Sequence, residues 1–217
     1  MDFAKYIDHT NLATDANAED IAHVCAEAKE YGFAAVCVNP IWVEMAVDLL
    51  DGTDVEVCSV IGFPTGAHRP EVKFFEALRA LSDGATELDM VIDVAALKAN
   101  DRETVDRDIA PLADAAHEND AVLKVILETA LLTDEEIIRG CQWAEQFGAD
   151  YVKTSTGMLK GENTGATTRV IALMRESVSD GIGVKASGGI RDRQTAEAMI
   201  AAGATRIGTS SSVAIVS

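Results

Sequence analysis

Short apolar runs and longer segments with helical periodicity alternate along the whole chain. In the longer segments apolar residues recur three and four positions apart, as Ile21, Val24, Cys25 and Ala28 do. The short runs, which we interpret as strands, cover residues 7–10, 34–39, 55–61, 87–94, 122–128, 151–156, 183–187 and 206–210. Eight strands that alternate with helices predict an α/β fold, a (β/α)8 TIM barrel that forms a single domain over residues 1–217. The alternative is an open doubly wound sheet, although the chain carries no glycine-rich dinucleotide fingerprint.

Local signals mark where several of the helices begin and end. Thr133 with Glu136 three residues later fits a capping box, and Pro70 suits the first turn of a helix. Pro111 lies inside a helical segment, which we expect it to split or kink. Helices are expected to end where a left-handed residue would favour glycine, near Gly32, Gly84, Gly148 and Gly203.

Composition narrows the class of protein. Apolar residues make up 48 % of the chain and aromatic residues only 5 %, so Ala, Val, Ile and Leu must build the core. No apolar run approaches the ~20 residues that span a bilayer, and the N-terminal residues lack the order of a signal peptide. We therefore expect a cytoplasmic protein. The cysteines show no metal-type spacing and are expected to be reduced core thiols; they are Cys25, Cys37, Cys58 and Cys141.

The charge balance is strongly acidic. The chain has 36 Asp and Glu against 18 Lys and Arg, a formal net charge of −18. Such a surface repels nucleic acids and anionic membranes, so we expect neither as a partner. The acids are spread over the helical segments without a low-complexity run, which is typical of a folded protein rather than a disordered tail. This pattern resembles that of proteins adapted to molar salt.

Polar residues late in the strand runs are candidates for an active site, because barrels of this kind place it at the carboxyl ends of the strands. They are Asp8, Thr10, Asn39, Asp89, Asp93, Lys124, Lys153 and Lys185. Three of the chain's eight lysines are among them, on consecutive strands. Chance, or snorkelling at a strand end, explains one lysine in an apolar run, whereas three together favour a function.

Lysines that converge in a partly dry pocket favour Schiff-base chemistry. Desolvation and neighbouring positive charge both disfavour the ammonium form, so one amine can be neutral near neutral pH. A neutral amine attacks an aldehyde or ketone, and the resulting iminium draws electrons from an adjacent C–C bond. Asp89 is a candidate to shuttle protons to the carbinolamine and to the substrate hydroxyl. Lys153 is then the candidate nucleophile, and the chemistry needs no metal and no cofactor.

Two glycine-containing clusters follow the last two strand runs. A-S-G-G-I-R covers residues 186–191 and G-T-S-S-S covers residues 208–212. In barrels the loops at these two positions often hold a phosphate group through backbone N–H groups. Tight turns alone would also explain the paired glycines, but the presence of both clusters after these strands favours a phosphate site.

Together these motifs resemble those of the deoxyribose-phosphate aldolase family. In order, they are I-D-H-T (7–10), C-V-N-P (37–40), G-F-P-T-G (62–66), E-L-D-M-V-I-D (87–93), K-V-I-L-E-T (124–129), V-K-T-S-T-G (152–157), V-K-A-S-G-G-I-R (184–191) and R-I-G-T-S-S (206–211). The resemblance covers almost the whole chain. Its most specific part is the pair V-K-T-S-T-G and K-A-S-G-G-I-R at this spacing.

The resemblance implies a class I aldolase that reversibly cleaves 2-deoxy-D-ribose 5-phosphate into D-glyceraldehyde 3-phosphate and acetaldehyde, in the catabolism of deoxyribonucleosides. It implies that Lys153 is the Schiff-base lysine, Lys185 the neighbouring amine that favours its neutral form, and Asp89 the acid/base partner. The implied phosphate-site residues are Gly157, Gly188, Gly189, Gly208, Ser210 and Ser211, and the residues implied to line the sugar end are Thr10 and Thr156.

The chain departs from the family pattern at two places. Many relatives have a lysine directly after K-T-S-T-G, where this chain has Met158, with Lys160 two positions later. Some relatives carry a tyrosine implicated in proton transfer in a C-terminal tail, whereas the last tyrosine here is Tyr151. Asp89 and an ordered water are then the candidates for moving the methyl proton of bound acetaldehyde.

Two other functions stay open at this point. One is a Schiff-base aldolase that acts on a different phosphorylated sugar, and the other is a non-catalytic barrel that binds a phosphosugar. In each case we expect a small phosphosugar ligand, no nucleic-acid or membrane partner, and a homo-oligomer in the form of a dimer or tetramer.

Overall fold

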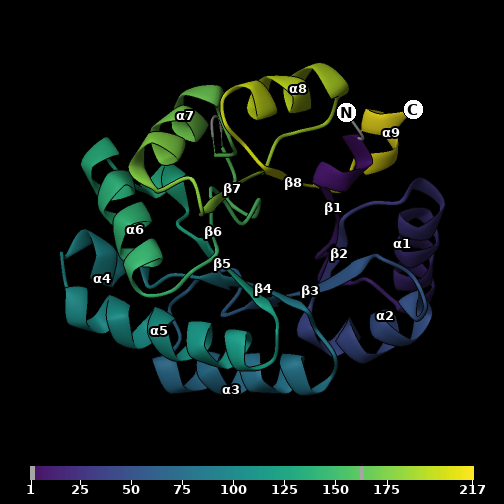
Figure 1. The fold of residues 1–217 in the computed structure, drawn as a ribbon, viewed down its shortest axis with the longest axis horizontal. Helices are drawn as coiled ribbons and strands as arrows, with labels where there is room; N and C mark the ends of the chain where they lie inside the picture. Colours follow the sequence, from purple (N-terminus) through teal and green to yellow (C-terminus); the bar gives the residue numbers. More distant parts are fainter. Residues whose placement is uncertain (1–2, 162–163) are drawn as a thin grey trace.

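The strands form one closed parallel barrel (Figure 1). The computed structural model describes residues 3–161 and 164–217, so four residues of the predicted 1–217 domain lie outside the described part. The strands are β1 (Ile7–Asn11), β2 (Ala35–Val38), β3 (Glu56–Ile61), β4 (Glu87–Val91), β5 (Val122–Ile126), β6 (Tyr151–Lys153), β7 (Gly183–Ser187) and β8 (Arg206–Thr209). Pairing of Ile7 with Ile207 joins β1 to β8 and closes the ring. The predicted barrel is therefore confirmed, and the open sheet is excluded.

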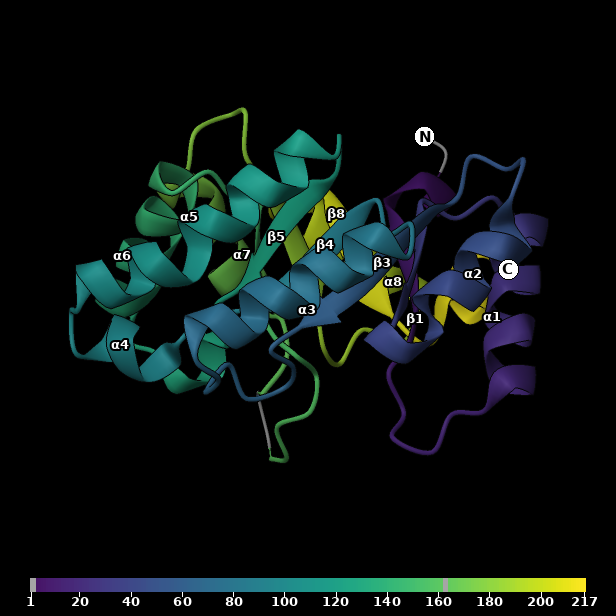
Figure 2. The same cartoon turned by 90° about the horizontal axis from the view of Figure 1, so that it is seen from below.

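Helices surround the barrel on its outside (Figures 1 and 2). They are α1 (Ala18–Tyr31), α2 (Val43–Leu50), α3 (Pro70–Ser82), α4 (Val94–Lys98), α5 (Arg102–Glu118), α6 (Asp134–Gln146), α7 (Thr168–Ser177), α8 (Arg193–Ala201) and α9 (Ser212–Val216), with short 3-10 turns η1 (Phe3–Tyr6), η2 (Pro40–Trp42) and η3 (Thr129–Leu131). In the described part of the chain, no helix combines the length and the apolar character needed to cross a membrane.

Most of the predicted helix boundaries are confirmed. Thr133 and Glu136 form the capping box of α6, and Pro70 occupies the first turn of α3. The predicted terminal glycines all have positive φ angles; they are Gly32, Gly84, Gly148 and Gly203. The predicted split at Pro111 is wrong, because α5 runs through it without a break. Pro111 and Arg107, whose carbonyl loses a donor there, are both exposed, so water can take the place of the missing hydrogen bond.

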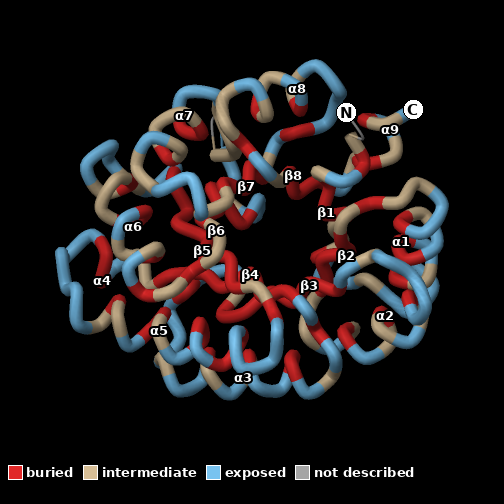
Figure 3. Tube along the Cα trace, viewed as in Figure 1, coloured by how far each residue is buried: buried red, intermediate tan, exposed pale blue. Residues whose placement is uncertain are grey.

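Side chains alternate between two environments along each strand. Leu123 and Val125 of β5 belong to the apolar core that packs between the barrel and its helices, whereas Lys124 lies inside the barrel. Figure 3 shows that the barrel wall is almost entirely buried and that exposure is confined to the outer helix faces and loops. A strand run can therefore be continuously buried and still carry charged residues, which face the interior of the barrel.

Several predicted strand runs are longer than the strands observed. The chain leaves the sheet after Val91, Ile126 and Lys153, but the next residues stay buried and bonded to the neighbouring strand. The N–H of Ile92 donates to the carbonyl of Ile126 at 3.1 Å, and that of Leu127 donates to Lys153 at 2.9 Å. These extensions hold the starts of the loops at the carboxyl end of the barrel, where the loops after β1 and β6 project together (Figure 2).

Candidate active site

Lys153, Lys185 and Asp89 meet inside the barrel. Lys153 and Lys185 are neighbours in the register of β6 and β7, and Asp89 reaches them from β4. Oδ2 of Asp89 lies 2.6 Å from Nζ of Lys153 and 2.7 Å from Nζ of Lys185. All three side chains are buried, with Lys153 only 3 % exposed. The residues that the sequence suggested for catalysis are therefore in direct contact.

Further charged side chains continue this group toward the amino end of the barrel. Lys124 contacts Oδ1 of Asp89 at 2.8 Å and Glu87 at 2.6 Å. Arg206 pairs with Asp8 at 2.6 Å and with Glu87 at 3.1 Å, and Asp8 also contacts Lys185. Sequence reasoning missed Glu87 and Arg206. The two-residue spacing of Glu87 and Asp89 on one strand was the available signal, because it puts both on the inner face.

These contacts keep Asp8 and Asp89 ionised and Lys185 charged. Burial by itself would raise the pKa of Asp89, but the charges of Lys124, Lys153 and Lys185 outweigh it and hold that pKa well below its usual range. Burial would lower the pKa of Lys185, yet Asp8 and Asp89 raise it above its ordinary value. Asp8 likewise has a lowered pKa, because Lys185, Arg206 and Lys124 overcome the effect of its burial.

The interior group carries one more cation than anions. Its cations are Lys124, Lys153, Lys185 and Arg206, and its carboxylates are Asp8, Glu87 and Asp89. Loss of one proton would therefore make the group neutral. Lys153 is the member of this group that lines the cavity above it. It is the amine placed to meet a substrate.

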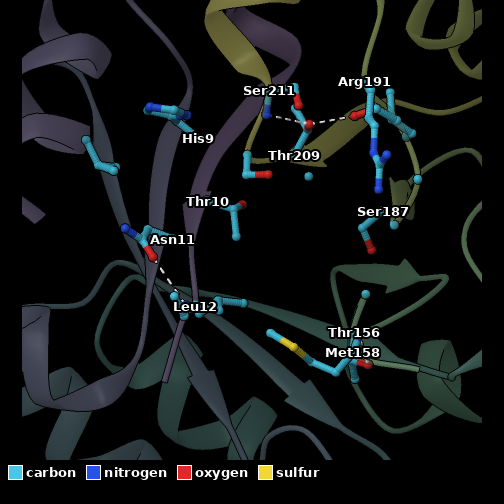
Figure 4. Close-up of a pocket in the computed structure, with 18 of the residues that line it drawn as sticks. His9, Thr10, Asn11, Leu12, Thr156, Met158, Ser187, Arg191, Thr209 and Ser211 are labelled. Atoms are coloured by element: carbon cyan, nitrogen blue, oxygen red, sulfur yellow. Dashed lines mark hydrogen bonds between the residues drawn. The ribbon is translucent and has the colours of Figure 1, made fainter. Parts of the chain in front are cut away.

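A cavity of about 680 Å³ opens at the carboxyl end of the barrel, and Lys153 is one of the residues that line it. Figure 4 shows this cavity with other lining residues labelled. All the residues predicted for substrate or phosphate binding line it; they are Thr10, Thr156, Gly157, Gly188, Gly189, Gly208, Ser210 and Ser211. Figure 4 shows Thr10, Thr156 and Ser187 on different sides of one open space. Asp89 and Lys185 do not line the cavity in the described part of the chain. Asp89 contacts the lining residue Lys153, and Lys185 contacts Asp89.

Three hydroxyl groups in the middle of the cavity already donate their protons to the protein. Thr10 donates to the carbonyl of Asp8 at 3.0 Å, and Ser187 donates to that of Ser155 at 2.6 Å. The Thr156 hydroxyl donates to a carboxylate oxygen of Glu128. Each of these hydroxyls is left with at least one acceptor lone pair for a ligand.

Glu128 was not identified from the sequence. It follows β5 in a left-handed conformation with φ of 56°, and its side chain is buried. Besides the Thr156 hydroxyl, its carboxylate accepts the backbone N–H of Thr156, with both oxygens at 3.3 Å. Burial raises the pKa of Glu128, against the hydrogen bonds from Thr156 and the charge of Lys153, which lower it. No sequence pattern indicates that a residue as large as Glu128 will have a positive φ angle.

The opposite side of the cavity offers hydrogen-bond donors. Gly188 and Gly189 have φ angles of 85° and 80°, which place consecutive backbone units in a conformation that favours glycine. Within the described residues, their N–H groups donate to no protein acceptor. Arg191 also lines the cavity and extends its guanidinium toward the open space (Figure 4). Lys160 is exposed and does not line the cavity in the described part of the chain, so Arg191 is the nearer cation.

Two other polar residues from the strand ends are not in the site. Asp93 caps α4 by accepting the N–H of Ala96 at 2.9 Å. Asn39 precedes the turn η2, and neither residue lines the cavity in the described part of the chain. Asn39 directly follows β2, and Asp93 lies two residues after the end of β4.

Cys37, Cys58 and Asp89 lie close enough together to be considered as metal ligands. One ligand atom from each falls within 4.8 Å of the others, and all three side chains are buried. However, Nζ of Lys124 lies 3.4 Å from Sγ of Cys58 and 2.8 Å from Oδ1 of Asp89. An ammonium group thus already contacts two of the three ligand atoms, so this cluster does not fit a bound cation.

The chain matches the model of the DeoC/LacD family aldolases over residues 3–217. A protein of Geobacillus sp. (strain WCH70) named deoxyribose-phosphate aldolase is 59 % identical over 213 residues, which is 98 % of this chain and 94 % of that protein. One of the same name from Bacillus cereus (strain B4264) is 55 % identical over 100 % of this chain and 95 % of its own. A solved structure, described as the unique tetrameric structure of deoxyribose phosphate aldolase from Aeropyrum pernix, superposes with a TM-score of 0.91 at 37 % identity, covering 99 % of this chain and 89 % of that chain.

Proposed function

Because the chain belongs to the DeoC/LacD aldolase family, we propose that it reversibly cleaves 2-deoxy-D-ribose 5-phosphate into D-glyceraldehyde 3-phosphate and acetaldehyde. The observation that carries this proposal is the position of Lys153. Its amine lies at the floor of the cavity, in contact with Asp89, within a buried group that has one surplus positive charge. These are the conditions in which a lysine can act as a nucleophile toward an aldehyde.

The reaction begins with attack of the neutral Lys153 amine on the aldehyde carbon of the open-chain sugar. The carbinolamine loses water to give an iminium ion. The hydroxyl on the third carbon of the sugar then loses its proton, and the bond between the second and third carbons breaks. Its electron pair forms the enamine, which neutralises the iminium, while the third carbon becomes the aldehyde of the departing product. D-glyceraldehyde 3-phosphate departs, the enamine carbon takes up a proton, and water hydrolyses the new iminium to acetaldehyde and the free amine.

Asp89 and Lys185 support these steps from below. Asp89 contacts the reacting nitrogen at 2.6 Å, so it can exchange a proton with the amine and the carbinolamine. Lys185 shares the same carboxylate oxygen and keeps its charge, which opposes a second positive charge on Lys153. Both roles agree with the spacing of the three side chains.

The phosphate of the sugar is expected to bind at the donor-rich side of the cavity. The supporting features are the N–H groups of Gly188 and Gly189, which donate to no acceptor among the residues the structure describes, the Arg191 guanidinium, and the hydroxyls of Ser210 and Ser211. A phosphate held there would direct the other end of the sugar toward Lys153 and past Thr10 and Thr156. The remaining implied phosphate residues, Gly157 and Gly208, allow the ligand to approach the backbone closely.

Reductive trapping tests the proposed function directly. Incubation with acetaldehyde and borohydride should add an ethyl group to Lys153, and peptide mass mapping should locate it there. Lys153→Ala should abolish both labelling and aldol cleavage, whereas Lys160→Ala should retain both, because Lys160 is exposed outside the cavity lining. Labelling confined to an exposed lysine such as Lys5 would refute the mechanism.

We extend the proposal to the setting in which the enzyme works. The absence of a membrane-spanning helix in the described residues and the acidic composition support a cytoplasmic enzyme without membrane or nucleic-acid partners. Exposed apolar side chains such as Ile41 and Phe75, at 80 % and 72 %, support a homo-oligomer. Size-exclusion chromatography with light scattering would identify a dimer or a tetramer.

A further inference from the structure

The contact between Glu128 and Thr156 fixes which way one hydrogen bond in the cavity can run. A threonine hydroxyl has one proton and two lone pairs. The proton of Thr156 is donated to the Glu128 carboxylate, and one lone pair accepts the N–H of Met158 at 3.1 Å. A single lone pair remains for the cavity that Thr156 lines.

Glu128 holds this arrangement more firmly than a carbonyl would. Its carboxylate also accepts the backbone N–H of Thr156, and a hydrogen bond to an ionised acceptor is roughly twice as strong as a neutral one. The backbone around Glu128 is tied to the same loop, because the N–H of Thr129 donates to the carbonyl of Thr154 at 2.9 Å. Thr10 and Ser187, by contrast, donate to backbone carbonyls and can turn toward a ligand at lower cost.

The direction of the bond excludes one role for Thr156 and assigns another. The oxygen of an aldehyde under attack gains negative charge and needs a hydrogen-bond donor. The remaining lone pair of Thr156 is an acceptor, so it cannot stabilise that oxygen. It can accept a hydrogen bond from a substrate hydroxyl. On D-glyceraldehyde 3-phosphate, with its phosphate ionised, the hydroxyl next to the carbonyl carbon is the group that can supply that proton.

We propose that Glu128 is a positioning residue that locks Thr156 as a hydrogen-bond acceptor, so that the site selects acceptor aldehydes with a hydroxyl next to the carbonyl. This inference rests on the proposed function and adds to it the Thr156 hydroxyl as the group that recognises the acceptor aldehyde. Glu128 does not line the cavity in the described part of the chain and acts through Thr156.

The test compares two acceptors in aldol addition with saturating acetaldehyde: D-glyceraldehyde 3-phosphate and 3-oxopropyl phosphate, which lacks the hydroxyl. Wild-type enzyme should prefer the hydroxylated aldehyde in kcat/KM by roughly tenfold, the effect of one well-formed hydrogen bond in a desolvated site. Thr156→Val and Glu128→Leu should each reduce this preference toward equality. Glu128→Gln keeps an oxygen acceptor and should retain most of it.

A double-mutant comparison separates positioning from general support. Adding Glu128→Leu to Thr156→Val should change the preference no further, whereas adding it to Thr10→Val should give independent effects. Trapping at Lys153 with acetaldehyde and borohydride serves as the check that each variant has a folded site. An unchanged preference in Glu128→Leu that still traps acetaldehyde would overturn the inference. Failure of wild-type enzyme to add acetaldehyde to either aldehyde would instead overturn the proposed function.

Discussion

Lys153 and Lys185 contact the same oxygen atom, Oδ2 of Asp89, at 2.6 and 2.7 Å. One carboxylate oxygen thus faces two ammonium groups, while its other oxygen faces Lys124 at 2.8 Å. The attraction that Asp89 can offer is divided among three amines. The amine with the fewest other acidic partners is Lys153, because Lys124 also contacts Glu87 and Lys185 also contacts Asp8. In the described part of the chain, Lys153 is thus the amine of the three that has Asp89 as its one carboxylate partner within 4.0 Å.

Replacement of Lys185 should therefore shift the pH dependence of the reaction. In Lys185→Met, Oδ2 of Asp89 would be left to Lys153 alone, which would retain its proton to higher pH. We expect the alkaline rise of kcat/KM to move upward by about one pH unit or more, with the loss of activity concentrated at neutral pH. A pH–rate profile superposable on that of the wild type would show that Lys185 does not influence the nucleophile.

Removal of the Asp89 charge should affect both turnover and stability. Asp89→Asn should slow cleavage by roughly 10²–10⁴-fold, the effect of losing a general acid/base. It should also lower the free energy of unfolding by about 3–5 kcal/mol, because buried ammonium groups would lose a partner. Asp93→Asn makes the same chemical change outside the site and preserves the cap of α4, so it should leave both quantities near their wild-type values. Equal effects of the two substitutions in steady-state kinetics and urea unfolding would contradict this account.

A negative charge at Gly189 should weaken binding of phosphorylated substrate. A side chain has open space there, and Asp and Asn both tolerate the positive φ of this position better than most residues. Gly189→Asp should raise KM for 2-deoxy-D-ribose 5-phosphate roughly 10–100-fold relative to Gly189→Asn, through repulsion of like charges. The two variants should not differ toward deoxyribose itself. If they differ equally toward both sugars, this loop does not bind phosphate.

The raised pKa of Glu128 predicts a pH-dependent effect on stability. A carboxyl that binds its proton more tightly in the folded chain stabilises the fold below its ordinary pKa of 4.5, and that contribution is lost as pH rises through the raised value. Glutamine does not ionise. The free energy of unfolding of Glu128→Gln, relative to wild type, should therefore increase as pH rises above 4.5. If Lys153 fully offset the cost of burying the Glu128 carboxylate, urea unfolding would instead show the same difference in free energy of unfolding between variant and wild type at every pH.

Salt should stabilise the protein. Of the described acidic residues, few are buried: Asp8, Glu87, Asp89, Asp108 and Glu128. The other acids repel one another at the surface, and added salt shortens the Debye length from ~10 Å at 0.1 M to ~3 Å at 1 M. The midpoint of thermal unfolding, followed by circular dichroism, should rise between about 0.1 and about 3 M KCl, with activity retained. A flat or falling midpoint would refute adaptation to high salt.

The sequence predicted the strands and the catalytic lysines because both follow from local patterns. Alternation along a strand reveals which side of the barrel a residue faces, so Lys153 and Lys185 could be assigned to one site. Partners far apart in the sequence leave no such pattern. Lys73 on α3 is fully buried and pairs with Asp108 on α5 at 2.7 Å, and it also donates to the carbonyl of Val91. Neither helix alone indicates that its polar residue will find a partner.

The same limit applies to the orientation of groups within the site. Thr156, the second threonine of K-T-S-T-G, could be assigned to the cavity from its place after a strand. The direction of its hydrogen bond depends on Glu128, whose left-handed backbone is imposed by the surrounding structure. For a related reason the split at Pro111 does not occur, since tertiary packing of α5 outweighs the local cost of a proline on its exposed face.

The pairing of Asp8 with Arg206 also bears on the order in which the molecule can be assembled. These residues are 198 positions apart and belong to the first and last strands. During synthesis from the amino terminus, Asp8 emerges long before Arg206. A nascent chain that stopped before β8 would lack the Arg206 partner of Asp8 and the strand that closes the barrel. This would be so even if its earlier helices had already formed. The catalytic interior is therefore completed late in folding, only after β8 has been synthesised and has joined the sheet.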